Sequence, residues 1–178
     1  MSKYIRKILL SEDEIRQMVE KVGKNISRDY AGKKPVLIGV LKGSLIFMAD
    51  LMRALDIPCT IDFLSVSSYS GTKSSGIVKI NRDVDCEIEG RDVILVEDVV
   101  DTGLTLDYLR ELLLQRKPAS IAVCAAFDKP ECRKIPVTVE YVGAVIPNEF
   151  VVGYGLDYNQ DYRELPYLAV LADKEECE

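Results

Sequence analysis

Apolar and polar positions along the chain follow two periods, one typical of strands and one typical of helices. Residues 35–40, 91–98 and 120–127 are short runs dominated by apolar and β-branched side chains, as in strands buried on both faces. Residues 44–55 and 104–117 instead carry apolar side chains at helical spacing. This alternation predicts an α/β fold in which a central, mostly parallel sheet is flanked by helices.

The remaining segments complete this pattern. Ser11 and Glu14 have the spacing of a capping box, and apolar residues at helical spacing continue to Ile26, so we predict a helix that closes at Gly32. Further strands are predicted over three ranges: 59–69, 77–80 and 139–146. The C-terminal quarter has the pattern of short strands and turns. No linker or repeat divides residues 1–178, so we expect a single domain.

Composition and charge narrow the class of protein. Of the 178 residues, 48% are hydrophobic and 29% are charged, which is ordinary for a globular protein. No apolar run is long enough to cross a membrane, and the charged N-terminus has no signal-peptide core, so we expect a cytoplasmic protein with no membrane partner. The net charge of −6 argues against nucleic acid as a partner. Five cysteines without C-x-x-C spacing favour reduced thiols over disulfides or structural zinc.

The chain contains no histidine. Ser-His-Asp and Cys-His catalysis and histidine metal sites are therefore excluded. If the protein is an enzyme, proton transfer must fall to carboxylates, lysine, tyrosine or cysteine. A metal held by this chain would be a hard cation on oxygen ligands, with Mg²⁺ as the first expectation.

The sequence DTGLT, which is Asp101, Thr102, Gly103, Leu104 and Thr105, follows one of the predicted strands and opens a predicted helix. The chain has neither a Walker loop nor a G-x-G-x-x-G motif. Backbone N–H groups that converge at a helix N-terminus nevertheless favour an anion, the two threonines add hydroxyl groups, and glycine allows close approach. The local chemistry predicts a phosphate site, with a plain strand-to-helix turn capped by Asp101 as the alternative.

Glu97 and Asp98 are adjacent carboxylates at the end of the same strand. The two carboxylates would repel each other and a nearby phosphate. They would favour binding only of a ligand that also carries hydroxyl groups or comes with Mg²⁺. A phosphorylated sugar with a free diol meets both conditions. The alternative is a solvated acidic pair with no ligand.

The stretch VILVEDVVDTGLTL at 93–106 resembles the signature with which type I phosphoribosyltransferases bind 5-phosphoribosyl-1-pyrophosphate (PRPP). Nearly the whole chain is similar to the hypoxanthine-guanine phosphoribosyltransferase family, in its bacterial form. The supporting motifs are LKGS at 41–44, SSYSG at 67–71, DKP at 128–130 and IPNEFVVGYGLDYNQDYREL at 146–165.

The resemblance implies a type I phosphoribosyltransferase fold with a PRPP-binding core and a small hood formed by the terminal segments. It implies transfer of the 5-phosphoribosyl group from PRPP to N9 of hypoxanthine or guanine, which gives IMP or GMP plus pyrophosphate, with Mg²⁺ as cofactor. It also implies a homodimer or homotetramer.

By the same resemblance, Glu97 and Asp98 would hold the ribose hydroxyls, and together with Asp157 they would be linked to the metal. Residues 101–105 would cradle the 5-phosphate. Asp101 would also be the catalytic residue, as general base or acid at purine N7, a role that a carboxylate can fill in a chain without histidine.

The resemblance also assigns the pyrophosphate side and a lid. Lys42 and Gly43 would bind pyrophosphate mainly through the backbone, and Arg163 would face it, with a surface ion pair as the alternative for Arg163. Ser68 and Tyr69 would belong to a lid that closes over the site and excludes water.

Base recognition is implied for Lys129, Phe150, Val151 and Asp157. An ammonium group only donates hydrogen bonds, so Lys129 suits the 6-oxo group of hypoxanthine or guanine and not the amino group of adenine. Phe150 would stack on the base, and Val151 would contribute backbone groups. Without the resemblance, Lys129 would be interpreted as solvated and Phe150 as a core residue.

Two other classes of protein share this pattern. One is another type I phosphoribosyltransferase, for adenine, xanthine or orotate, which the assignments of Lys129, Phe150 and Asp157 together separate. The other is a regulator that keeps the PRPP-binding fold and binds RNA, against which the acidic charge balance argues.

Overall fold

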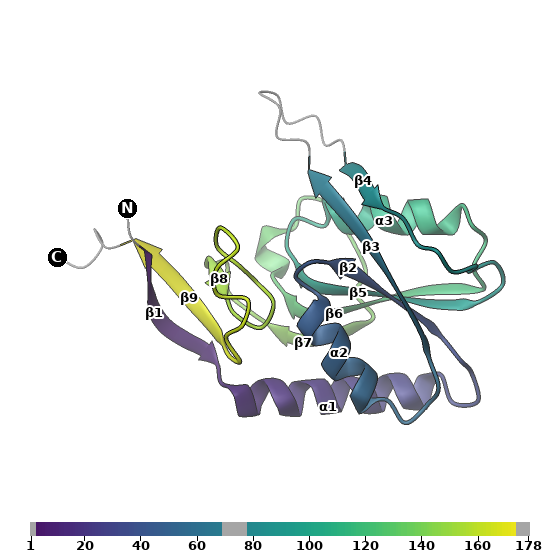
Figure 1. Ribbon diagram of the computed structural model, residues 1–178, viewed down its shortest axis with the longest axis horizontal. Helices are drawn as coiled ribbons and strands as arrows, with labels where there is room; N and C mark the ends of the chain where they lie inside the picture. Colours follow the sequence, from purple (N-terminus) through teal and green to yellow (C-terminus); the bar gives the residue numbers. More distant parts are fainter. Residues whose placement is uncertain (1–2, 69–77, 174–178) are drawn as a thin grey trace.

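The computed structural model describes residues 3–68 and 78–173 (Figure 1). A six-stranded sheet forms its centre, in the order β4-β3-β2-β5-β6-β7. All neighbouring pairs are parallel except β3 with β4, which is antiparallel. The strands are β2 (Val36–Leu41), β3 (Thr60–Ser68), β4 (Val78–Arg82), β5 (Asp92–Val100), β6 (Ser120–Asp128) and β7 (Tyr141–Val145).

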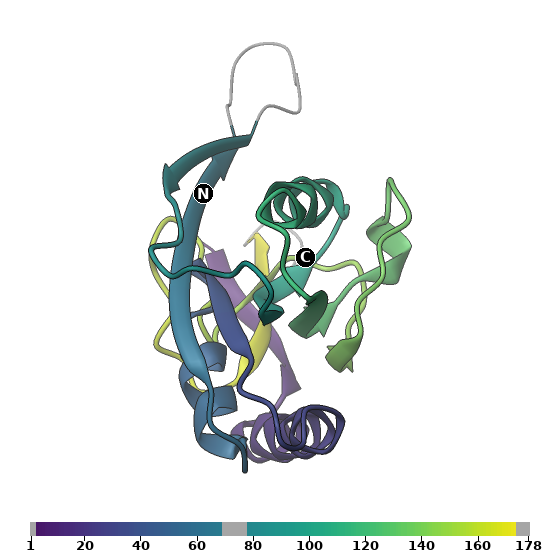
Figure 2. The same cartoon turned by 90° about the vertical axis from the view of Figure 1, so that its right-hand side faces the viewer.

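Helices cover both faces of this sheet. They are α1 (Glu12–Asp29), α2 (Leu45–Ala54) and α3 (Leu104–Leu114), and a short 3-10 helix, η1 (Pro130–Cys132), follows β6. On β5, Ile94 and Val96 pack into the core beneath α1 and α2, whereas Val93 and Leu95 pack beneath α3. Figure 2 shows α3 and α1 on opposite sides of the strands. The predicted α/β fold is confirmed.

A second, antiparallel sheet forms the hood. Its order is β1-β9-β8, from β1 (Lys3–Leu10), β9 (Leu168–Asp173) and β8 (Val151–Val152). In Figure 1 the β1–β9 pair lies beside the main sheet at the N-terminal end of α1. The pairing of β1 with β9 is interrupted by two register shifts. The side chains of β1 therefore do not alternate regularly between apolar and polar. The sequence pattern therefore did not predict β1, although it did indicate short strands in the C-terminal quarter.

The ends of the elements differ from the prediction by a few residues. The capping box is present, since the Glu14 amide donates to Ser11 Oγ at 3.3 Å and the Glu14 carboxylate accepts from the Ser11 amide at 2.8 Å. Helix α1 ends at Asp29, however, and Gly32 lies beyond it in a turn with φ of 76°. Strand β5 continues to Val100, two residues past the predicted end. No helix in the described residues is long and apolar enough to span a membrane.

Candidate active site

The DTGLT turn joins the carboxyl end of β5 to the first residue of α3. Gly103 is the N-cap of that helix, with φ of 87°, and a side chain there would crowd Val137. Thr102 Oγ accepts a hydrogen bond of 3.4 Å from the amide of Leu104. The alternative in which Asp101 caps the helix is therefore wrong, and the exposed carboxylate of Asp101 has no capping role.

A small hollow of about 90 Å³ lies at this turn. Its lining comes from the end of β5, the turn itself and the first turn of α3: Glu97, Val99, Val100, Asp101, Thr102, Gly103, Thr105 and Leu106. The helix N-terminus opens beside it, where the peptide dipoles favour a negative group. Four of the five predicted phosphate-binding residues, all except Leu104, thus line one concave surface.

Arg133 supports the turn from behind. Its guanidinium donates to the carbonyl oxygen of Val100 at 2.8 Å, to that of Asp101 and to the carboxylate of Asp128. These contacts tie the end of β5 to the end of β6, which carries Lys129. Within residues 131–140 only Arg133 matches the family pattern, and the sequence analysis assigned it no contact, because two of its three partners are backbone carbonyl groups about 30 residues away.

Glu97 and Asp98 point to different sides of β5 and differ in environment. The Glu97 side chain is 6% exposed, and burial, followed by the charge of Asp98, raises the pKa of its carboxyl well above the usual value. Burial also raises the pKa of Asp98, which the Val99 amide and Arg163 partly offset. The solvated interpretation is wrong for Glu97, which is costly to keep charged unless a ligand or cation compensates.

The predicted pyrophosphate loop lies against Asp98. The peptide bond between Leu41 and Lys42 is cis, and Gly43 is buried. A Cβ atom on Gly43 would lie 1.5 Å from Asp98 Oδ2. Ser44 then begins α2, and its buried hydroxyl donates to the carbonyl oxygen of Val40 at 2.7 Å. The loop therefore contacts the end of β5 through the one residue that has no side chain.

Arg163 reaches the same loop from the C-terminal part of the chain. Its guanidinium donates to the Gly155 carbonyl oxygen at 2.7 Å and forms an ion pair of 2.8 Å with Asp157. Gln160 Oε1 accepts from Lys42 Nζ at 3.1 Å and from Arg163 at 3.4 Å. The ion pair that was the alternative for Arg163 exists, but it lies inside the site. The sequence analysis missed Gln160, which lies within a quoted motif.

The predicted base-binding residues surround the end of β6. Lys129 is 8% exposed, and its ammonium donates to the carbonyl oxygen of Glu149 at 2.7 Å. Phe150 is 53% exposed and meets Tyr158 edge-on, whereas Val151 is buried in β8. The interpretations of Lys129 as solvated and of Phe150 as core are therefore both wrong.

Glu149 connects this region to the predicted hood, and the sequence analysis did not anticipate this role of Glu149. Its carboxylate forms ion pairs with Arg6 and Lys7 of β1, at 2.5 and 3.0 Å. Its carbonyl oxygen holds Lys129. Hydrogen bonding to Lys7 is the main cause that lowers the pKa of Glu149, so this anchor is ionised at neutral pH.

The predicted lid is only partly described. Ser68 is the last residue of β3, and its backbone pairs with Val78 of β4. Tyr69 and residues 70–76 lie outside the described residues, so the lid stays a prediction.

The carboxylates fit a hard cation only with help from a ligand. Among residues 3–68 and 78–173, no group of three or more His, Cys, Asp or Glu side chains could hold a metal ion. Asp98 and Asp157 are nevertheless close enough for the charge of one to raise the pKa of the other. Mg²⁺ commonly takes one or two carboxylates and completes its shell with water and substrate phosphates. The donor set therefore suits Mg²⁺ that arrives with a phosphorylated substrate.

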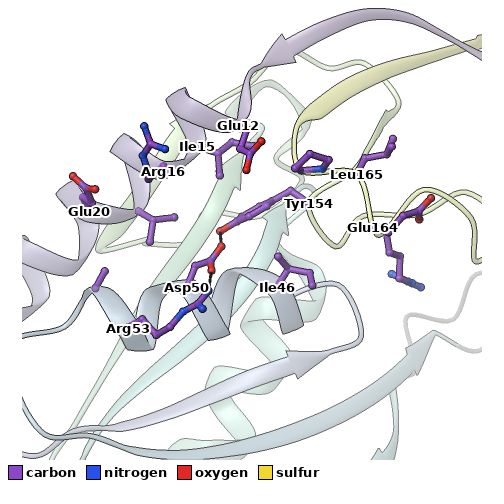
Figure 3. Close-up of a pocket in the computed structure, with 14 residues that line it drawn as sticks. Glu12, Ile15, Arg16, Glu20, Ile46, Asp50, Arg53, Tyr154, Glu164 and Leu165 are labelled. Atoms are coloured by element: carbon purple, nitrogen blue, oxygen red, sulfur yellow. Dashed lines mark hydrogen bonds and ion pairs between the residues drawn. The ribbon is translucent and has the colours of Figure 1, made fainter.

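The structure also contains a larger cavity, of about 510 Å³ (Figure 3). It opens between α1, α2 and residues 154–166, and Arg163 and Tyr154 are among the residues that line it. It is away from the DTGLT turn and from Lys129, so its size does not identify it as the site of chemistry.

The fold places the candidate phosphate turn and the acidic pair at the carboxyl end of β5, where parallel α/β sheets bind their ligands. The chain matches the phosphoribosyl transferase domain over residues 6–159. A hypoxanthine-guanine phosphoribosyltransferase from Streptococcus pyogenes is 54% identical over 171 residues, which cover 96% of this chain and 95% of the relative. The chain therefore belongs to the phosphoribosyltransferase family.

Solved structures of the same family have a similar fold. A hypoxanthine-guanine phosphoribosyltransferase from Bacillus anthracis superposes with a TM-score of 0.91 at 43% identity, over 97% of this chain and 100% of that chain. A hypoxanthine phosphoribosyl transferase from Trypanosoma cruzi has a TM-score of 0.91 at 46% identity, over 97% of this chain and 94% of that chain. The predicted type I phosphoribosyltransferase fold is thereby confirmed.

Proposed function

We propose that this chain is a purine-salvage enzyme that transfers the 5-phosphoribosyl group from PRPP to N9 of hypoxanthine or guanine, giving IMP or GMP plus pyrophosphate. The observation that carries the proposal is the buried ammonium of Lys129 next to the exposed ring of Phe150. The ring offers a stacking surface, and the ammonium offers hydrogen-bond donors alone. The names of the two hypoxanthine-guanine phosphoribosyltransferases from Streptococcus pyogenes and Bacillus anthracis add support.

The phosphorylated sugar binds at the end of β5. Residues 101–105 cradle the 5-phosphate with backbone amides and threonine hydroxyls, helped by the dipole of α3. Glu97 and Asp98 accept hydrogen bonds from the ribose hydroxyls, and Asp98 and Asp157 would hold Mg²⁺. When bound, that ion would neutralise negative charge on the diphosphate. Burial of Glu97 supports this assignment, because a ligand donor would relieve its desolvation.

Pyrophosphate, the leaving group, binds at the loop that contains Lys42 and Gly43. Lys42 and Gly43 present the loop, and Arg163 places its guanidinium toward the charge that grows as pyrophosphate departs. The pairing of Arg163 with Gln160 and Asp157 holds that cation in place before substrate arrives. Asp101, at the edge of the phosphate hollow, exchanges a proton with purine N7.

The base is selected by Lys129. Only one of the three ammonium donors is used by Glu149, so others are available for the 6-oxo group. We expect Lys129→Met to raise the KM for hypoxanthine and guanine about 20-fold, since a hydrogen bond to a charged group contributes roughly 1.5–3 kcal/mol. The KM for PRPP stays unchanged. Lys134→Met is the matched control, because Lys134 is an exposed lysine of the next loop. Equal effects of the two variants on steady-state kinetics would contradict the assignment.

The decisive test of function is PRPP- and Mg²⁺-dependent release of pyrophosphate, measured with hypoxanthine, guanine, xanthine and adenine in separate reactions. Turnover with hypoxanthine or guanine, and none with adenine, is expected. Turnover with adenine would overturn the base assignment and leave the PRPP site standing. PRPP binding without turnover of any base would instead favour the RNA-binding regulator, for which an RNA-binding assay is the next measurement.

The enzyme forms a homodimer or homotetramer through the outer face of α2. Leu45, Ile46 and Met52 are exposed apolar residues of that helix, opposite the side that packs on the sheet. Beside them, the larger cavity carries both signs of charge, including Glu20 and Arg16 of α1. Mixed charges around an apolar patch suit pairing with a second copy of the same surface.

We expect Ile46→Glu to convert the assembly to monomers in sedimentation equilibrium, because Ile46 is 39% exposed and lines the cavity. Leu114→Glu, an exposed position at the end of α3, should leave the assembly intact. A wild-type chain that sediments as a monomer would overturn this proposal.

The whole chain acts as one cytoplasmic domain without a nucleic-acid partner. The hood and the main sheet share one hydrophobic core, which includes Val170 of β9 and Ile94 of β5. The four described cysteines, Cys59, Cys86, Cys124 and Cys132, are free, which suits a reducing compartment.

A further inference from the structure

Tyr154 makes a buried hydrogen bond that the proposed reaction does not use directly. The side chain is 4% exposed, and its hydroxyl donates to Asp50 Oδ2 at 2.8 Å. Asp50 lies in α2 and also pairs with Arg53, one turn further along the helix. Figure 3 shows the phenol reaching from the 154–166 segment to the Asp50 carboxylate. Burial, and then this hydrogen bond, raises the pKa of the phenol, so it remains a donor at neutral pH.

The turn that carries Tyr154 has an unusual backbone. Gly153, Tyr154 and Gly155 all have positive φ, at 97°, 50° and 96°. A bulky residue such as Tyr154 rarely adopts positive φ, so contacts with the surrounding residues must stabilise this backbone conformation. The Tyr154 amide donates to the Leu165 carbonyl oxygen at 2.8 Å, and the Gly155 amide donates to that of Arg163 at 3.0 Å. The hydrogen bond from the phenol to Asp50 ties this turn to α2.

Gly155 touches both parts of the pyrophosphate side. A Cβ atom on Gly155 would lie 2.1 Å from the carbonyl oxygen of Gly43, so the two backbones are in direct contact. The carbonyl oxygen of Gly155 accepts the 2.7 Å hydrogen bond from Arg163. The position of one backbone unit therefore sets the positions of a loop and of a cation.

These contacts close a ring. The chain runs from Gly43 into α2, along α2 to Asp50, across the hydrogen bond to Tyr154, and through Gly155 back to Gly43. A shift at any contact moves the loop relative to Arg163.

We infer that Tyr154 and Asp50 are positioning residues whose hydrogen bond aligns the Gly43 loop with Arg163 for binding the diphosphate group. This inference rests on the proposed function, in which that loop and Arg163 receive the pyrophosphate of PRPP. It predicts that loss of the bond weakens binding of PRPP and pyrophosphate and leaves purine binding unchanged, because Lys129 and Phe150 lie outside the ring.

Tyr154→Phe tests the inference because it removes one oxygen atom and keeps the ring, which packs edge-on against Phe127 at 6.2 Å. We expect the dissociation constants of Mg²⁺–PRPP and Mg²⁺–pyrophosphate, measured by calorimetry, to rise about tenfold, as for loss of a hydrogen bond to a charged acceptor. The KM for hypoxanthine should not change. Tyr30→Phe, at another buried tyrosine far along α1, is the matched control and should leave all constants unchanged.

Asp50 supplies the second pair of variants. Asp50→Asn keeps an oxygen that can accept from the phenol and should bind PRPP nearly as the wild type does. Asp50→Ala should match Tyr154→Phe, and the double variant should be no worse than either single one, because all three remove the same bond. If Tyr154→Phe does not fold, the comparison of Asp50→Asn with Asp50→Ala gives the same readout.

Unchanged dissociation constants in Tyr154→Phe or Asp50→Ala would overturn the inference, including the case in which only the melting temperature falls. Calorimetry separates this failure from failure of the proposed function, because PRPP binding requires no turnover. A wild type that binds PRPP without transferring it to a purine would refute the proposed reaction, and the variants would still report on the ring.

Discussion

Asp101→Asn is expected to lower kcat by about 10²–10⁴-fold, the usual contribution of a positioned general acid or base. The amide keeps the shape of the carboxyl group and removes its ability to exchange a proton with purine N7. Asp101 has no role in capping α3, which Gly103 caps instead, so the helix should be unaffected. Steady-state kinetics over a range of pH, with circular dichroism to verify the fold, provide the measurement.

The matched control is Asp107→Asn, which removes a carboxylate from the first turn of the same helix. It costs a little helix-dipole stabilisation and should leave kcat unchanged. If the two variants lose activity equally, Asp101 acts only through its charge on the helix N-terminus, and the acid–base role would have to be abandoned.

Gly43→Ala should reduce kcat/KM for PRPP by roughly 10²-fold, because an added methyl group would occupy the space of the Asp98 carboxylate. Asp98 is half-buried and accepts a hydrogen bond from the Val99 amide, so relief of the clash moves either that carboxylate or the loop. A misplacement of about 1 Å in a catalytic group is enough for a loss of this size.

Gly32→Ala provides the control for Gly43→Ala. A Cβ atom at Gly32 meets nothing within 4 Å, although the positive φ there costs about 1 kcal/mol of stability. We expect Gly32→Ala to lower the melting temperature slightly and to keep full activity. Gly43→Ala should lower the melting temperature as well, because its clash with Asp98 must be relieved, and should also lose activity. Full activity of Gly43→Ala would show that the loop moves freely and does not depend on Asp98.

The main sheet and the phosphate turn could be predicted from sequence because their signals are local. Buried parallel strands are continuous apolar runs, and the turn at 101–105 carries its own donors, so neither requires knowledge of distant residues. The resemblance to a family allowed Lys129 and Phe150 to be predicted as base-binding residues. Their residue types alone would have indicated a solvated lysine and an aromatic ring in the core. Burial of the first and exposure of the second agree with the resemblance.

The supporting residues could not be predicted because their partners are far away in sequence. Glu149 meets Arg6 across 143 residues, and Gln160 meets Lys42 across 118. Arg133 binds carbonyl groups, which leave no trace in the side-chain pattern. Strand β1 was missed for the same reason, because only its pairing with β9 makes it a strand. Contacts between residues that are distant in sequence could therefore be identified only from the structure.

The pairing of β1 with β9 also has a consequence for how the chain folds as it is made. Lys3 pairs with Asp173, so β1 is synthesised about 170 residues before its partner strand exists. The parallel core of β2, β5 and β6 can assemble much earlier. An unpaired strand is prone to aggregate, and basic residues on it reduce that risk. Arg6 and Lys7, which pair with Glu149 in the folded chain, are two such basic residues of β1.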